Sequence, residues 1–184
     1  MVVHGGQFRT LVTFSRIHAT CGATVISVQL RYNYRIYPDT SQQAALARAF
    51  GCARVVWNDC LRARKKAYEA GLAYPTSAVM SKLCITQAKR TKERSWLAEV
   101  SAVVLQQSLR DLDAAFKSFF DSVAGKRTGR RVGPPRFKSR KESRQSIRLT
   151  SGAFGVRGNG RCMWQGWVTS KSHGRGSSRR SPRR

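Results

Sequence analysis

The chemistry that stands out in this sequence is a dense run of cationic side chains between residues 126 and 148. Ten arginines and lysines fall there, and a single acid, Glu142, opposes them. Such groups neutralise the phosphates of a nucleic-acid backbone and release its counterions. Phe137 lies inside the run, and an aromatic ring among cations can stack on bases. The predicted contacts are Lys126, Arg127, Arg130, Arg131, Arg136, Phe137, Lys138, Arg140, Lys141 and Arg144.

Two simpler interpretations of the same run remain open. A charged run is often only a solvated loop, and Phe137 can instead belong to the hydrophobic core. Further candidates for nucleic-acid contact lie upstream, on a predicted strand, a predicted helix, a turn and a second helix. In chain order they are Arg31, Arg35, Arg54, Asn58, Arg62, Lys65, Tyr74 and Gln106. The amide of Gln106 has the groups needed to pair with an adenine edge, although a surface glutamine is usually just solvated.

Residues for catalysis or metal binding do not gather anywhere along the chain. Two-metal phosphodiester cleavage needs clustered carboxylates, and the acids here are scattered over helical surfaces. The five cysteines contain no C-x-x-C pair, so no zinc ribbon is predicted. The sequence therefore predicts no catalytic residues, no metal site, no cofactor and no small-molecule substrate.

The overall charge points to a polyanionic partner. The chain has 184 residues, with 35 Lys and Arg against 9 Asp and Glu, for a formal net charge of +26. Self-repulsion at that charge opposes compaction unless counter-charges bind, and DNA or RNA supplies them. No lipidation motif or long apolar run indicates a membrane partner. The unpaired cysteine pattern fits a reducing cytosol, so a cytoplasmic protein is expected.

The elements that must position these residues begin near residue 29. Leu30–Tyr37 alternates in the manner of a half-buried strand, which Pro38 ends. Thr40 is the predicted N-cap of the next helix, with Gln43 as its capping-box partner. Helix is predicted from Ala44 to Phe50 and again from about Ala53 to Ala70, with Gly51 as the break. Residues 39–71 are therefore predicted to form a helix-turn-helix, a weak signal because many helical hairpins bind no DNA.

The rest of the chain divides by composition. Helices are predicted over Ser77–Lys89 and Ser101–Val123, the second from apolar residues spaced by four and three. Glycines and prolines exclude helix after Gly125, and Ser146–Thr150 is a candidate strand. Residues 156–184 are rich in Gly, Ser and Arg, which predicts a disordered tail, and a frameshifted tail is a further hypothesis. Residues 1–28 have no clear period and are left as an unassigned leader, a candidate for sequence that precedes the functional start.

Four stretches together resemble a known family. They are Arg31–Pro38, the Gly-Cys-Ala-Arg-Val-Val-Trp-Asn run of Gly51–Asn58, Trp96–Phe120 with its Leu-Gln-x-x-Leu spacing, and Gly-Pro-Pro-Arg-Phe-Lys at Gly133–Lys138. In this order and spacing they are similar to the N-terminal part of the TnpB/OrfB proteins of bacterial insertion sequences. Each motif alone is weak, and the set of four covers about residues 29–155.

The resemblance implies a fold and a function. It implies an α+β, mainly α chain, with a helical recognition domain (39–124) inserted into an incomplete β-barrel wedge domain (29–38 and 125–155) and followed by the disordered basic tail. For the complete family protein it implies RNA-guided, metal-dependent DNA cleavage, with DNA and a transposon-derived guide RNA as partners. The family's RuvC-like centre and zinc ribbon match nothing here, so the resemblance implies a noncatalytic binding fragment of a transposase. An active nuclease, a basic RNA-binding structural protein and a nonfunctional remnant are the alternatives.

Overall fold

The computed structural model describes residues 2–5, 10–16, 19–21, 24–26, 30–141, 145–150, 153–156, 162–164 and 167–168. They belong to two compact units, one made of Met1–Leu46 with Ser143–Arg184 and the other of Ala47–Glu142. Most of the predicted disordered tail lies outside the described residues. Helices predominate in the described part, and strands accompany them, which agrees with the expected mainly α, α+β class.

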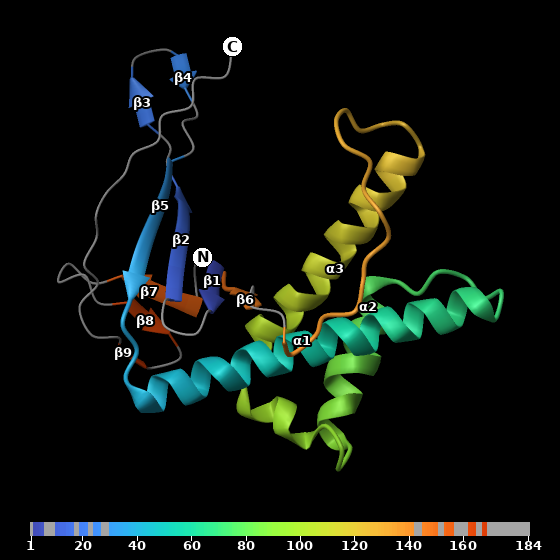
Figure 1. Ribbon diagram of the computed structural model, residues 1–184, viewed down its shortest axis with the longest axis horizontal. Coiled ribbons are helices and arrows are strands. Elements are labelled where there is room, and N and C mark those ends of the chain that lie inside the picture. The colour runs from blue at the N-terminus through green and yellow to red at the C-terminus, as the bar shows by residue number, and fades with distance from the viewer. Residues whose placement is uncertain are drawn as a thin grey trace. The chain divides into compact units, whose positions relative to one another are not determined.

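The first unit holds the strands. Its largest sheet is antiparallel, with the order β5-β2-β1-β6 (Figure 1). The strands predicted at Leu30–Tyr37 and Ser146–Thr150 are present as β5 and β6. The stretch that the sequence left unassigned contains β1 to β4. The bounds are β1 Val2–Gly5, β2 Thr10–Arg16, β3 Ala19–Cys21, β4 Thr24–Ile26, β5 Leu30–Ile36, β6 Gln145–Arg148, β7 Phe154–Val156, β8 Cys162–Trp164 and β9 Trp167–Val168.

The long helix α1, Thr40–Glu69, begins with a capping box one residue earlier than predicted. The Asp39 carboxylate accepts from the backbone N–H of Gln42 at 2.9 Å, and the side-chain Oε1 of Gln42 accepts from the backbone N–H of Asp39 at 3.2 Å. The predicted pair Thr40 and Gln43 is therefore wrong. Asp39 is the better cap because its carboxylate accepts from both the Gln42 N–H and the Ser41 hydroxyl, and these bonds lower its pKa.

Helix α1 runs without a break through Gly51, so the predicted turn between two helices is wrong (Figure 1). A glycine inside a helix costs only about 0.5–1 kcal/mol relative to alanine. The neighbouring Ala49, Phe50, Cys52 and Ala53 are all buried. Burial of one large apolar side chain contributes about 1.5–3 kcal/mol, which outweighs the penalty of the glycine. The burial of the neighbouring side chains therefore outweighs the local tendency of the glycine to interrupt the helix.

A Gly51→Ala substitution should stabilise the protein. The added Cβ would meet only Arg54 Nη2, at 4.0 Å, which is ordinary contact. We expect a gain of about 0.5–1 kcal/mol and a melting temperature higher by a few degrees, measured by circular dichroism. Gly71→Ala is the control, because its Cβ also enters open space but its φ is +66°, and there we expect destabilisation. A lower melting temperature for Gly51→Ala would indicate a break in the helix at this residue.

The helices of the second unit pack around α1. The helical run predicted at Ser77–Lys89 is present, but it changes type along its length: α2 Ser77–Ser81, the π-helix η1 Lys82–Gln87 and the 3₁₀-helix η2 Ala88–Arg90. A further 3₁₀-helix, η3, spans Ser95–Glu99. The last helix, α3 Ala102–Val123, matches the predicted Ser101–Val123, with Ser101 as its N-cap.

The core of this unit lies between α1 and α3. The predicted apolar face of α3 is buried at Leu105, Leu109 and Leu112, together with Val56 and Leu61 of α1. Its C-terminal part, Phe116 and Phe119, is only half buried. None of the helices in the described part of the chain is sufficiently long and apolar to cross a membrane.

Candidate nucleic-acid interface

The basic segment, defined here as residues 126–141, follows α3 without forming helix or strand, as predicted. Helix α3 ends at Val123, and Gly125, two residues later, has a φ of +68° that allows the Lys126 N–H to donate to the Asp121 carbonyl. Farther along, the Val132 N–H donates to Ser122 Oγ at 3.0 Å. The chain then runs along α1 (Figure 1).

Two adjacent residues of α1, Trp57 and Asn58, hold the backbone of the basic segment. Trp57 Nε1 donates to the Arg136 carbonyl at 2.9 Å. Asn58 Nδ2 donates to the Lys138 carbonyl at 3.0 Å, and Asn58 Oδ1 accepts from the Lys138 N–H at 2.9 Å. Both ends of the Asn58 amide are therefore occupied. Asn58 was predicted to contact nucleic acid. In the structure its amide instead holds the segment in place by bonding the part-buried N–H and carbonyl of Lys138.

Three cations lie over aromatic rings at this junction. Lys138 Nζ is 3.8 Å from the centre of the Trp57 indole, which itself is buried. The Phe137 ring has Lys65 Nζ at 4.9 Å and the Arg62 guanidinium at 6.0 Å from its centre. Phe137 is 47% exposed, so the alternative that it anchors the hydrophobic core is wrong. The junction brings together Arg62, Lys65, Phe137 and Lys138, four of the predicted contacts, from segments far apart in the sequence.

The other cations of the segment point to solvent. Arg127, Arg130, Arg131 and Arg136 are exposed, and within the described ranges none of the four forms an ion pair. Asp121 has a lowered pKa, mainly because Lys117 donates to it at 2.8 Å, with smaller contributions from Lys126 and Arg127. Little negative charge is therefore available to compensate these arginines.

Acids accompany the α1 cations more closely. Asp59 pairs with Arg62 at 3.1 Å and with Arg94 at 3.0 Å. The surface of α1 is therefore partly neutralised, whereas the four exposed arginines of the basic segment form no ion pair with any described residue. This contrast makes the segment the stronger of the two predicted anion-binding surfaces.

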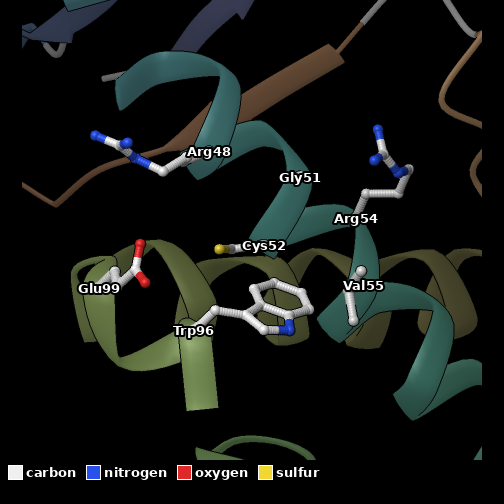
Figure 2. Close-up of a pocket in the computed structure, with 7 residues that line it drawn as sticks. All are labelled: Arg48, Gly51, Cys52, Arg54, Val55, Trp96 and Glu99. Carbon is white, nitrogen blue, oxygen red and sulfur yellow. The ribbon is translucent and has the colours of Figure 1, made fainter. Parts of the chain in front are cut away.

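Arg54 lies apart from that junction and lines a pocket of about 230 Å³ (Figure 2). Figure 2 shows Trp96 and Glu99 on the same segment, across the pocket from α1, which carries Arg48 and Cys52. Burial, reinforced by the charge of Glu99, raises the pKa of the Cys52 thiol to about 11. The thiol thus stays protonated at neutral pH and is a poor nucleophile.

Tyr74 and Gln106 occupy other places in the fold. The Tyr74 ring contacts Phe116 edge-on at 5.9 Å and has the Arg64 guanidinium 4.9 Å from its centre. Gln106 is half buried, and its side-chain Nε2 donates to Ser81 Oγ at 2.7 Å, so this amide nitrogen is already bonded inside the unit. The structure does not bring either residue to the junction at Phe137.

Three remaining candidates give no side-chain geometry. Arg31 and Arg35 lie in β5, where only the backbone is described, and Arg144 falls outside the described residues. In the described part of the chain, no three His, Cys, Asp or Glu side chains come together as a metal site would require. The expectation of no cofactor stays a prediction.

Sequence reasoning missed the roles of Trp57, Arg64 and Asp113. Trp57 stands beside Asn58 in the Gly51–Asn58 motif, so the motif itself was the signal. Arg64 is 3% exposed and pairs with Asp113 of α3, although its neighbours along the helix, Arg62 and Lys65, are exposed to solvent. No sequence signal identifies that pair, because the partners are 49 residues apart.

A family model described as a helix-turn-helix domain of the OrfB type from IS605-like elements matches residues 27–72. The chain is 42% identical over 127 residues to a protein of Streptomyces pristinaespiralis named as a candidate RNA-guided DNA endonuclease, covering 69% of this chain and 29% of that protein. It is 31% identical over 109 residues to InsQ of Escherichia coli, named likewise, with coverages of 59% and 25%. A virulence protein of Salmonella dublin, VsdF, is 30% identical over 92 residues, with coverages of 47% and 77%.

Between a quarter and a third of the length of the two endonuclease-named relatives is therefore matched by this chain. The residues that the family model matches contain β5 and most of α1. Their helix is continuous, so the name of the domain does not describe its local geometry here.

Proposed function

Because the chain belongs to the TnpB/OrfB family of insertion-sequence proteins, we propose that it binds the phosphate backbone of a nucleic acid through the basic segment. The observation that supports this proposal is the combination of a backbone held by hydrogen bonds with four exposed arginines, Arg127, Arg130, Arg131 and Arg136, that pair with no described acid. Arg136 and Lys138 are fixed through their backbones to Trp57 and Asn58. Exposed arginines on either side of Gly129 and at residue 136 supply the charge. A held row of cations loses less conformational entropy on binding than a free one.

We propose DNA and a guide RNA as its partners, which the names of the endonuclease-named relatives support, and a location in the cytoplasm beside the nucleoid. In the same proposal, the sheet unit corresponds to the family's wedge domain and the helical unit to its recognition domain. A basic RNA-binding structural protein is the second candidate, favoured only by the net charge of +26. A protein of that kind should bind any RNA with equal affinity, and replacing the arginines of the basic segment should not change that affinity selectively.

The test measures binding to labelled duplex DNA and to labelled RNA by fluorescence anisotropy at a series of salt concentrations. Four neutralised phosphates give a slope of log affinity against log salt of about −3.6 on duplex DNA. A slope near zero would reject the proposal. A thermal melt of the same preparation distinguishes a nonfunctional remnant, which would show no cooperative transition.

We further propose that the 184-residue chain does not cut DNA. Phosphodiester cleavage of the two-metal type needs clustered carboxylates, and no such cluster occurs among the described residues. Asp39 caps a helix, and Asp59, Asp113 and Asp121 are ion-pair partners. Incubation with plasmid DNA and magnesium, with and without RNA transcribed from a neighbouring element, should leave the DNA intact. Cleavage that disappears on replacing one of these acids would contradict this prediction.

A further inference from the structure

Phe137 differs from the other exposed aromatic residues in what surrounds it. Phe120 is 51% exposed, but its ring packs against those of Tyr74, Phe116 and Phe119, with centres 5.2–6.3 Å apart. The Phe137 ring is 47% exposed and has cations over it instead, Lys65 and Arg62. An exposed apolar ring inside a cationic segment is in unfavourable contact with water, and it does not offset this by packing in the core. Its surroundings match those of a ring that stacks on a base.

The backbone on both sides of Phe137 is fixed. The residue before it is held through its carbonyl by Trp57, and the residue after it is held through both N–H and carbonyl by Asn58. Lys138 adds a contact of its ammonium group with the Trp57 indole at 3.8 Å. The ring is therefore presented from an ordered position, and little rotational freedom is lost when a planar ligand stacks on it.

From these contacts we propose that Phe137 is a stacking platform for one unpaired nucleobase of the bound strand. This inference rests on the proposed function, and it names the substrate class: nucleic acid that contains a single-stranded or unpaired position. Bases inside a duplex are stacked on one another and offer only their edges, so an aromatic face requires a base outside the stack. Every base has such a face, so the site tolerates different sequences.

The two cations complete the site. Lys65 is exposed on α1, and its flexible side chain can leave the ring for a phosphate while the base takes the ring face. Arg62 pairs with Asp59 at 3.1 Å, and its guanidinium lies 6.0 Å from the centre of the Phe137 ring. The phosphates on either side of the stacked base then lie between Lys65 and Arg136. Charge and stacking thus act on the same nucleotide.

The test compares a single-stranded oligothymidylate with a strand of the same length whose central sugars lack bases. Both carry the same phosphates, so the proposed phosphate contacts bind them equally. We expect the wild-type protein to prefer the strand with bases by about 5- to 100-fold. Phe137→Leu should abolish that preference and leave the salt slope and the melting temperature unchanged, whereas Phe137→Tyr should retain the preference. Phe120→Leu is the matched control, an exposed phenylalanine of the same unit, and should behave as wild type.

Each outcome decides the question. Equal wild-type affinity for the two strands, or a preference that survives in Phe137→Leu, would overturn the stacking site while the salt-dependent binding stands. Absence of salt-dependent binding to both strands would overturn the proposed function and the stacking site together. A strand carrying 2-aminopurine adds a direct measurement, because its fluorescence is quenched when the base stacks, and the quenching should disappear in Phe137→Leu only.

Discussion

An Asp113→Ala substitution should lower the free energy of unfolding of the helical unit by about 3 kcal/mol. The Arg64 side chain is 2% exposed, and the Asp113 carboxylate is its ion-pair partner. Within the described residues, Arg64 Nε and Nη1 have no hydrogen-bond partner. Removing the carboxylate leaves a buried guanidinium held only by the rings of Tyr74 and Phe116. We place the cost at the lower end of the usual range because Asp113 is itself 28% exposed and water can reach the site. Urea unfolding followed by circular dichroism measures it.

Arg64→Met is the comparison that identifies the cause. It removes the buried charge and keeps an apolar stem of similar length, so we expect a change within about 1 kcal/mol. Asp113 would keep its hydrogen bond from Ser77 Oγ, at 2.6 Å, and its contact with solvent. The double variant Arg64→Met/Asp113→Ala should then be more stable than Asp113→Ala alone. An equal loss from both single variants would mean that packing, rather than an uncompensated charge, determines the effect.

Replacing Arg127, Arg130, Arg131 and Arg136 with alanine should flatten the salt slope of duplex binding by about 3.6 units, if all four contact phosphates. The loss should be similar for different DNA sequences, because phosphate contacts carry little base information. Lys138 is left in place, because its ammonium group lies on Trp57 and its removal would disturb the junction. The four residues are exposed, so the melting temperature should change little.

A second fourfold variant supplies the control. Lys82, Arg90 and Arg110 are exposed on other helices of the same unit and Lys92 on the turn after Arg90, and replacing all four removes the same amount of charge from the net +26. We expect a much smaller change in slope, since screening limits long-range effects of surface charges at ordinary ionic strength. Equal flattening by the two variants would show that total charge, and not the basic segment, drives binding.

Several features were readable from the sequence because they depend on neighbours along the chain. The apolar spacing of Leu105, Leu109 and Leu112 predicted α3, and the alternation after Leu30 predicted β5. Glycine and proline content predicted that the basic segment would be irregular. Charge density alone identified it as the candidate anion-binding surface. Each of these signals is local, and local propensity and periodicity act over a few residues.

Gly51 marks where local reasoning failed. A glycine between two helical patterns is a common break, but the buried residues on both sides keep α1 continuous. The capping residue was misplaced by one position because Asp39 and Thr40 are both good caps, and the side-chain geometry of Gln42 and Ser41 decides between them. Such choices depend on which residues become buried, and the tertiary structure determines that.

The sequence by itself therefore determined the charge of the candidate binding surface, its place in the chain and the helix α3 that precedes it. Only the tertiary structure decided what that surface is built on. Trp57 and Asn58 meet Arg136 and Lys138 across about eighty residues, and Arg64 finds Asp113 across 49. The physical reason is that a polar group leaving water must find a partner wherever the folded chain brings one close, and sequence distance does not limit that choice.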